Sequence, residues 1–209
     1  MKVSLISSTP DGEKLIAYCA RVSSPNQDKV GYAKLLKYCM DHGHWSVFEQ
    51  AHMTIEIVTS RAISAQLIRH RSFTFQEFSQ RYSPAIGEFE IVEARAQDQA
   101  NRQNSLDTLD KYTKDWFRAA QETLFNDASK LYEEALTKGI AKECARNLLP
   151  LATQTKLYMT GNVRSWIHYL ESRCSPATQK EHREIALSIR DILVSTYPTI
   201  GALVLEKKV

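Results

Sequence analysis

The chain has 209 residues, of which 43% are hydrophobic and 24% are charged, and its net charge is +3. These values are ordinary for one globular domain with a sizeable core, and the small net charge without a long basic run argues against nucleic-acid binding. No apolar run is long enough to span a membrane, and residues 1–4 lack the features of a signal peptide. Four scattered cysteines without a CxxC pair indicate a reducing compartment, so we expect a cytoplasmic protein.

Two strands and two helices are predicted in the first sixty residues. Alternating apolar side chains indicate strands, and apolar side chains three and four residues apart indicate helices. We expect, in chain order, a strand over residues 2–8, a helix that opens at residues 9–12 and ends at 21–23, a helix over residues 28–42 and a strand over residues 51–60. Thr9 or Asp11 would cap the first helix, and Gly43 would end the second.

Two histidines, His42 and His44, lie two residues apart after the second predicted helix. Such a pair could contribute to a metal site, but no third ligand lies nearby in the sequence. The cysteines do not have metal-ligand spacing either. We therefore expect no bound metal.

The densest group of polar and aromatic residues lies between Arg69 and Tyr82. A helix is predicted over residues 61–71, on which Gln66, Arg69 and His70 would be neighbours on one flank. The following residues, 73–82, are rich in Phe, Thr and Tyr and are predicted to be extended. Alternate side chains of an extended segment share a face, so we expect the side chains at positions 77, 79 and 81 to lie together.

The chemistry of that shared face favours a ligand that carries a phosphate. The Ser79 hydroxyl beside the Arg81 guanidinium suits a phosphate, whereas Glu77 would repel one and would accept a hydrogen bond from a sugar hydroxyl or an arginine. The basic run at residues 69–71 suits a second anion. A solvated helix end whose charge complements the helix dipole would explain that run alone, but not the shared face.

The remaining residues are predicted to be mostly helical. We expect a short strand over residues 89–92, helices over 116–139 and 140–147, a strand over 156–160, and helices over 163–173 and 179–197. Asn162 would cap the third of these helices. Asn162 and Arg173 share a face of that helix but lie ~16 Å apart, so either the ligand is long or the helix serves two sites. The loop over residues 84–110 contains a polar stretch that is either a functional lid or a mobile insertion.

Two motifs resemble the flavin-dependent thymidylate synthase family, over a region that runs from about residue 15 to residue 198 without the polar loop. The first consists of Arg69, His70 and Arg71, then Ser79 after seven residues, within the run Glu77-Phe78-Ser79-Gln80-Arg81-Tyr82. The second is the run Ala145-Arg146-Asn147-Leu148-Leu149-Pro150-Leu151. Gln80 stands where the family usually has Gly, and Gln76 where it often has Asn. The first motif is long, and therefore far more specific than a lone glycine-rich match.

The resemblance implies a fold, a reaction and its ligands. It implies one mixed α/β domain over residues 1–209, with a central twisted sheet flanked by helices, in a homotetramer whose active sites are built from several subunits. The implied reaction is reductive methylation of deoxyuridine monophosphate (dUMP) to thymidine monophosphate (dTMP). The carbon would come from 5,10-methylenetetrahydrofolate and the hydride from FAD that NADPH reduces.

The resemblance also implies two sets of site residues. The nucleotide set comprises Gln66, Arg69, Glu77, Ser79, Gln80, Arg81, Arg146 and Arg173. The flavin set comprises Ser23, His44, Ser46, Arg69, His70, Arg71, Glu77, Asn162, Arg164 and His168. Arg173 would be the catalytic residue, because a guanidinium beside the uracil carbonyl stabilises negative charge as the ring is activated.

Cys174 follows Arg173, which could lower the pKa of the thiol and make it a nucleophile. Adjacent helical residues point about 100° apart, so the two side chains would not address one atom. The resemblance assigns no role to a cysteine. We therefore expect a reaction without a covalent bond between enzyme and nucleotide.

Two other classes of function fit part of the pattern. The basic, aromatic segment 69–82 could clamp single-stranded nucleic acid, although the small net charge and Glu77 disfavour this. A nucleotide-binding or nucleotide-hydrolysing protein without redox chemistry could use the same phosphate contacts. Against this alternative, the sequence lacks the acidic metal cluster that such hydrolases use.

Overall fold

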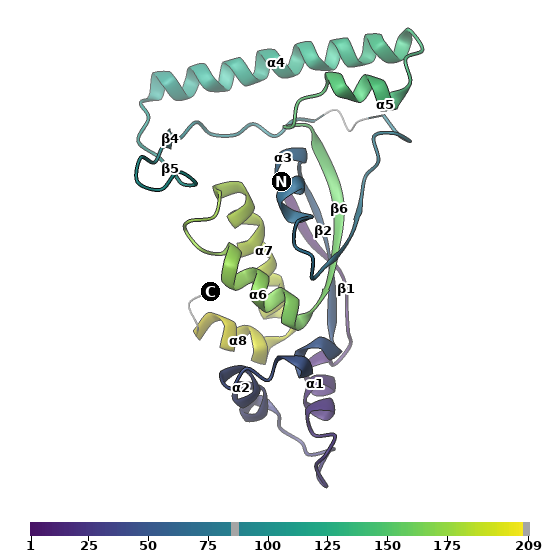
Figure 1. Ribbon diagram of the computed structural model, residues 1–209, viewed down its shortest axis with the longest axis vertical. Coiled ribbons are helices and arrows are strands. Elements are labelled where there is room, and N and C mark those ends of the chain that lie inside the picture. The colour runs from purple at the N-terminus through teal and green to yellow at the C-terminus, as the bar shows by residue number, and fades with distance from the viewer. Residues whose placement is uncertain (85–87, 207–209) are drawn as a thin grey trace. The chain divides into compact units, whose positions relative to one another are not determined.

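The computed structural model describes residues 1–84 and 88–206 and has a mixed α/β fold, as predicted (Figure 1). Its larger sheet has four strands in the order β1-β2-β6-β3. These strands are β1 (Lys2–Ser8), β2 (His52–Ser60), β6 (Gln154–Asn162) and β3 (Thr74–Glu77). A smaller antiparallel sheet pairs β4 (Ala96–Gln97) with β5 (Ser105–Leu106). Within the described residues, no helix is both long and apolar enough to cross a bilayer.

The chain divides into two compact units, to which β2 and β6 each contribute residues. Unit 1 consists of Met1, Val58–Leu67 and Glu77–Leu157. Unit 2 consists of Lys2–Ile57, Ile68–Gln76 and Tyr158–Val209, described as far as residue 206. Each unit has its own candidate residues, and we describe each by itself.

Unit 2 is a layer of helices on strands. Its helical elements are α1 (Gly12–Ala20), α2 (Ala33–Asp41), η1 (Trp45–Gln50), α6 (Val163–Arg173), α7 (Lys180–Thr196) and α8 (Pro198–Glu206). Helix α7 contacts α6, α8 and β1, and α2 contacts α8. Met53, Ile55 and Ile57 alternate along β2 and are fully or almost fully buried, as their spacing predicts. Trp166 of α6 is also buried and donates its indole N–H to the Met53 carbonyl (3.3 Å) and the Gly161 carbonyl (3.1 Å), which ties α6 to β2 and β6.

Unit 1 is built around a long helix. Its helical elements are α3 (Arg61–Leu67), α4 (Lys111–Thr137), α5 (Lys142–Ala145) and η2 (Arg146–Leu148), and α5 and η2 both contact α4 (Figure 1). Tyr132 and Ala135 of α4 form a buried cluster with Ala145. The Phe89 ring stacks on Phe125 with centroids 4.6 Å apart. This packing holds the turn that carries Arg146 against α4.

Several predicted boundaries agree with the structure because they depend on local signals. Strands β1 and β2 and helices α6 and α7 lie within about two residues of their predicted ends. Asn162 caps α6, since its Oδ1 accepts the Ser165 N–H at 2.8 Å. Gly43 has a positive φ of 69° directly after α2, and the next N–H, of His44, donates to the Cys39 carbonyl at 2.8 Å. Asp11 precedes α1, but its side chain makes no capping hydrogen bond.

The predicted geometry of residues 61–82 is wrong at two points. The helix ends at Leu67 instead of residue 71, because the chain turns there and the Phe73 N–H donates to the His70 carbonyl (3.2 Å). The extended segment ends at Glu77, because Ser79 organises a turn in which its carbonyl accepts the N–H of residues 82 and 83. Arg69 and His70 therefore lie beyond α3, and the side chains at positions 77, 79 and 81 do not share a strand face.

The polar stretch before α4 is more ordered than expected. Strands β4 and β5 form a hairpin, in which Asp98 accepts the N–H groups of Ala100 (2.8 Å) and Asn101 (3.0 Å). Asp110 accepts the Thr113 N–H, so α4 begins at residue 111 instead of 116. The predicted strand at 89–92 reduces to a single bridge between Phe89 and Thr153. Residues 85–87 of the predicted loop lie outside the described residues.

Other elements differ in extent. Helix α2 begins at Ala33 instead of residue 28, and the helix predicted over residues 140–147 is the short α5 followed by η2. Strand β6 extends over nine residues, beyond the predicted 156–160, and helix α8 was not predicted.

Gly161 lies where β6 meets α6 and leaves no room for a side chain. A Cβ there would lie 2.5 Å from Cε1 of Phe73, whose buried ring packs against Trp166 with centroids 4.6 Å apart. We expect Gly161→Ala to lower the free energy of unfolding by about 1–3 kcal/mol through overpacking. Chemical denaturation measures this loss. The same substitution in a Phe73→Leu background should cost less, and equal costs in both backgrounds would show that the ring is not the obstacle.

Candidate functional site

The carboxylate of Glu77, the last residue of β3, organises the polar residues of unit 1. Its Oε1 accepts hydrogen bonds from the hydroxyls of Ser64 in α3 (2.8 Å) and Thr155 in β6 (2.9 Å). The same oxygen forms an ion pair with Nη1 of Arg61 at 3.2 Å. Both charged side chains are about three-quarters buried, so water screens their attraction only partly. Elements α3 and β6 thus hold one carboxylate of β3 in place.

Arg61 extends this arrangement beyond the carboxylate. Its Nη2 donates to the Phe78 carbonyl at 2.8 Å, and its backbone N–H donates to the Thr153 carbonyl at 2.9 Å. Its Nε is buried and has no hydrogen-bond partner among the residues that the structure describes. The guanidinium is therefore fixed at one edge, and a donor on its other side remains unused.

A cavity of about 290 Å³ lies beside Arg61 in unit 1. It is lined by Arg61, Gln80, Arg146, Asn147, Leu149, Pro150, Leu151 and Thr153. The Gln80 side chain is 7% exposed, and its Nε2 is a second buried donor without a partner. The structure thus brings two members of the predicted nucleotide set, Gln80 and Arg146, to one cavity.

Ser79 and Arg81 are placed differently from what the sequence predicted. They are not among the lining residues of the cavity. The Ser79 Oγ accepts the backbone N–H of Arg81 (3.3 Å). The Arg81 side chain forms an ion pair with Glu143 (3.3 Å), and both partners are more than half exposed. Such an exposed pair contributes little, typically 0–1 kcal/mol, so Arg81 can exchange its partner at low cost.

Helix α6 in unit 2 carries or contacts much of the predicted flavin set. Arg164 forms an ion pair with Glu49 of η1, and the His168 ring packs edge-on against Trp45 with centroids 4.5 Å apart. His168 Nδ1 also lies 3.2 Å from Oε2 of Glu171. Asn162 has its Oδ1 committed to the helix cap, which leaves its NH₂ group for a ligand.

The end of α6 holds a contact between two predicted site residues. Arg173 donates its Nε–H to Nε2 of His70 at 3.0 Å, so His70 must be neutral, with its proton on Nδ1. The His70 ring lies edge-on to Tyr169, with centroids 5.0 Å apart. Behind it, His182 Nε2 lies 3.1 Å from the Tyr169 hydroxyl, and both residues are buried. This stack fixes the orientation of the Arg173 guanidinium.

Burial and charge keep both histidines of this group neutral. Burial, followed by the positive charge of Arg173, lowers the pKa of His70. Burial, with smaller contributions from Arg173 and His70, lowers the pKa of His182 to about 4. Burial also raises the pKa of the Tyr169 hydroxyl, which stays protonated. These groups therefore act as hydrogen-bonding and packing partners and not as charges.

The other predicted flavin residues of unit 2 face solvent. Ser23, His44, Ser46, Arg69 and Arg71 are exposed. Within the described residues, the side chains of Arg69 and Arg71 have no hydrogen-bond or ion-pair partner, and two free cations suit the diphosphate of FAD. The amide of Asn162 and the imidazoles suit the polar edge of a flavin ring. The cations and hydrogen-bonding side chains of unit 2 are thus chemically suited to bind FAD.

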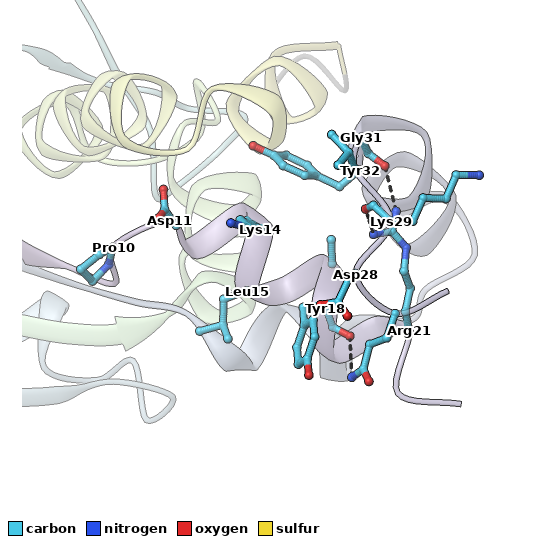
Figure 2. Close-up of a pocket in the computed structure, with 13 residues that line it drawn as sticks. Pro10, Asp11, Lys14, Leu15, Tyr18, Arg21, Asp28, Lys29, Gly31 and Tyr32 are labelled. Atoms are coloured by element: carbon cyan, nitrogen blue, oxygen red, sulfur yellow. Dashed lines mark hydrogen bonds between the residues drawn. The ribbon is translucent and has the colours of Figure 1, made fainter. Parts of the chain in front are cut away.

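A second and larger cavity, of about 650 Å³, contains none of the predicted residues (Figure 2). Helix α1 and the following segment line it, and Arg21 holds that segment by donating to the carbonyls of Lys29 (2.6 Å) and Gly31 (2.8 Å). Among the described residues, no group of three side chains could hold a metal ion.

Sequence reasoning missed five residues of these two groups, namely Arg61, Ser64, Thr155, Tyr169 and His182. Arg61 and Ser64 are three residues apart at the start of a predicted helix, and this spacing places them on one flank. The remaining three depend on contacts between distant segments, and no local pattern indicates them.

His182 should make stability depend on pH. Its pKa is about 4 in the folded chain and near 6.5 when unfolded, so between these values the unfolded state binds more protons. Stability is therefore fully present above pH ~6.5 and falls as the pH drops towards 4, by about 3 kcal/mol at most from this group. Urea denaturation at several pH values measures the slope. His182→Gln, which can still hydrogen-bond to Tyr169, should show a shallower loss, and an unchanged slope would contradict the assignment.

Comparisons with known proteins agree with the predicted family. The family described as "Thymidylate synthase complementing protein" matches residues 4–199. A flavin-dependent thymidylate synthase of Synechocystis sp. is 61% identical over 194 residues, which are 93% of this chain and 89% of the relative. A probable flavin-dependent thymidylate synthase of Paramecium bursaria Chlorella virus 1 is 50% identical over 199 residues, which are 94% of this chain and 92% of the relative.

A solved structure has the same fold. It is the UMP/dUMP methylase PolB from Streptomyces cacaoi bound with 5-Br dUMP. The TM-score is 0.85 at 25% sequence identity, and the match covers 96% of this chain and 93% of that one. From the family match and the two relatives, the chain belongs to the flavin-dependent thymidylate synthase family.

Proposed function

We propose that the chain converts dUMP, 5,10-methylenetetrahydrofolate, NADPH and a proton into dTMP, tetrahydrofolate and NADP⁺ in the cytoplasm, with FAD as the bound cofactor. One observation carries the proposal. Gln80 and Arg146 of the nucleotide set line one cavity of unit 1, and Asn162, Arg164 and His168 of the flavin set lie in α6 or at its start in unit 2. Gln66 belongs to unit 1, and Arg69 and Arg173 belong to unit 2. The structure of PolB with 5-Br dUMP supports a uracil nucleotide as the substrate.

Glu77 is suited to hold the sugar. Its Oε1 is occupied by three donors, and its Oε2 accepts no hydrogen bond within the described residues. A hydroxyl group of deoxyribose would donate to that second oxygen, and Gln66 would contact the sugar or base. Ser79, Arg81 and Arg146 would hold the phosphate, for which Arg81 would release Glu143.

Arg173 is suited to activate the pyrimidine. Its Nε is committed to His70, so its two Nη groups are oriented and remain to face the uracil carbonyl. There the guanidinium would stabilise the negative charge that develops on the ring. When bound, reduced FAD supplies the hydride, and the protein contributes positioning and electrostatics.

We also propose a homotetramer, supported by the exposed side of α4. Four of its large hydrophobic side chains, Tyr112, Trp116, Leu124 and Leu131, are between 52% and 83% exposed. The buried residues of α4 are Phe125, Ala128, Tyr132 and Ala135. An apolar stripe along a helix of about 40 Å is expected to be covered, and another copy of the chain would cover it.

The direct test is catalysis by the purified chain. Loaded with FAD, it should form dTMP from dUMP only when both the folate and NADPH are present. Arg146→Ala should weaken dUMP binding by about 1.5–3 kcal/mol, the usual scale for hydrogen bonds to charged groups, with little change in FAD binding. Isothermal titration calorimetry measures both affinities, and Arg118→Ala on the exposed face of α4 is the matched control. Absence of dTMP, or of a perturbed flavin spectrum at micromolar FAD, would rule the proposal out.

Cys174 should not be a nucleophile. Burial raises the pKa of its thiol, Arg190 lowers it by less, and Asp191 raises it slightly further, so the thiolate is disfavoured at neutral pH. We expect Cys174→Ala to retain most of its turnover. A loss of ~10³-fold or more in a variant that still folds and binds FAD would correspond to about 4 kcal/mol of barrier and would require a covalent role.

A further inference from the structure

We propose that Tyr169 and His182 are positioning residues that orient Arg173 for its step on the pyrimidine ring. They act through His70, whose ring they hold and whose Nε2 accepts the Arg173 Nε–H. Neither residue belongs to the recognised motifs, and both are buried, so they do not touch the substrate. This role rests on the proposed function of Arg173 and makes turnover depend on a hydrogen bond inside the protein.

Arg173 depends on His70 for its orientation. It is the last residue of α6, where the helical hydrogen bonding ends, and its long side chain has much rotational freedom. Within the described residues its side chain forms no ion pair, and it donates one hydrogen bond, to His70 Nε2 at 3.0 Å. Without that acceptor the two Nη groups could point in many directions. A misplacement of about 1 Å in a catalytic group can lower a rate about 100-fold.

The imidazole of His70 is not held by regular backbone structure. Residue 70 follows α3, which ends at Leu67, and lies in a turn before β3. The side chains on either side of it in the sequence, Arg69 and Arg71, are exposed. The orientation of the imidazole must therefore come from the side chains that pack against it.

Two buried rings hold the imidazole edge-on. The His70 ring is inclined at 79° to Tyr169, with centroids 5.0 Å apart, and at 86° to His182, with centroids 6.1 Å apart. Phe73 adds a third contact of this kind at 6.5 Å. Edge-to-face arrangements are among those that aromatic rings prefer. Because Tyr169 belongs to α6 and His182 to α7, two helices together orient the imidazole.

A hydrogen bond fixes the two supporting rings to each other. His182 Nε2 lies 3.1 Å from the Tyr169 hydroxyl oxygen, and the two residues are 0% and 2% exposed. Burial raises the pKa of the Tyr169 hydroxyl and lowers the pKa of His182 to about 4, so both groups are neutral at pH 7. If one member of such a buried pair is lost, the other loses a partner that water cannot easily replace. The pair therefore has a well-defined geometry.

Helix α6 carries both the support and the residue that it orients. Tyr169 and Arg173 are four residues apart and are thus neighbours on one flank of the helix. His70 contacts both of them, one through its ring and the other through Nε2. A change in the position of the Tyr169 ring would therefore shift the acceptor on which Arg173 depends.

Steady-state kinetics of FAD-loaded variants tests this role. Tyr169→Phe removes only the hydroxyl, and His182→Leu removes the ring nitrogens. We expect each to lower kcat about 5- to 30-fold and to change the KM for dUMP less than threefold, because the oriented charge acts mainly in the transition state. His182→Gln, which can still hydrogen-bond to Tyr169, should retain most of the parent kcat.

Tyr197→Phe is the matched control for Tyr169→Phe. Tyr197 is also a buried tyrosine of unit 2, and its hydroxyl donates to the His52 carbonyl at 3.0 Å. Its loss should lower stability without lowering kcat. A second control uses an Arg173→Lys background, in which Tyr169→Phe should lower kcat less than about twofold further, because the guanidinium that it positions is already absent.

NMR gives a readout that needs neither ligand nor turnover. The Arg173 Nε–H should exchange slowly with water because His70 accepts it, and the missing resonance in Arg173→Lys identifies the signal. We expect exchange about fivefold faster or more in Tyr169→Phe and His182→Leu, because the opened hydrogen bond is then more populated. Tyr197→Phe should leave the exchange rate unchanged.

Four results would overturn the proposed role. They are an unchanged kcat in Tyr169→Phe, an equal loss of kcat in Tyr197→Phe, a full effect of Tyr169→Phe in the Arg173→Lys background, and an unchanged exchange rate of the Arg173 Nε–H. If the parent chain forms no dTMP, the proposed function fails instead. The exchange rates would then still decide whether Tyr169 and His182 hold Arg173 in place.

Discussion

The ion pair between Glu77 and Arg61 is the interaction on which the geometry of unit 1 depends. Glu77 ends β3, Arg61 begins α3, and the hydroxyl of Thr155 brings β6 to the same oxygen. A partly buried carboxylate needs such donors, since removing one partner would leave an uncompensated charge. Glu77 and the Phe78 carbonyl fix the guanidinium, and within the described residues its buried Nε has no hydrogen-bond partner. The candidate substrate contacts of this unit follow from that placement.

Unit 2 uses a different device to orient an arginine. Arg173 is fixed through a single hydrogen bond to a neutral imidazole, and buried aromatic and histidine rings support that imidazole from behind. A carboxylate in this position would neutralise the charge of Arg173. Neutral His70 instead orients the guanidinium and leaves its charge available to a ligand. The opposite end of α6 is fixed by the Asn162 cap, so one rigid helix presents candidate residues at both ends.

Much of the fold could be predicted from the sequence, because many elements have local signals. Alternation predicted β2, and a capping residue predicted the start of α6. The end of α3 could not be predicted, because the chain leaves the helix where His70 reaches Arg173, more than a hundred residues away in the sequence. The β4–β5 hairpin was missed for a related reason. That segment has no hydrophobic pattern, and the Asp98 side chain holds it by accepting backbone N–H groups. Composition does not reveal such hydrogen bonds.

The candidate site also combines features that have a local sequence signal with features that depend on distant contacts. The motif that begins at Arg69 and the run around Arg146 were visible as sequence patterns, and they indicated the residue types that a nucleotide and a flavin need. Their grouping was not visible, because Arg81 pairs with Glu143 whereas Gln80 faces the cavity. Thr155 lies just outside the predicted strand, and only the pairing of β6 brings it to Glu77. Local patterns thus identified chemical roles, while tertiary contacts decided which residues act together.

A crystal structure of the FAD-loaded chain with dUMP most directly tests whether the Glu77–Arg61 pair builds the nucleotide site. We expect the phosphate within hydrogen-bond distance of Ser79, Arg81 and Arg146, and a deoxyribose hydroxyl on Oε2 of Glu77. A phosphate that contacts none of these three residues, or a sugar that does not contact Glu77, would contradict this arrangement.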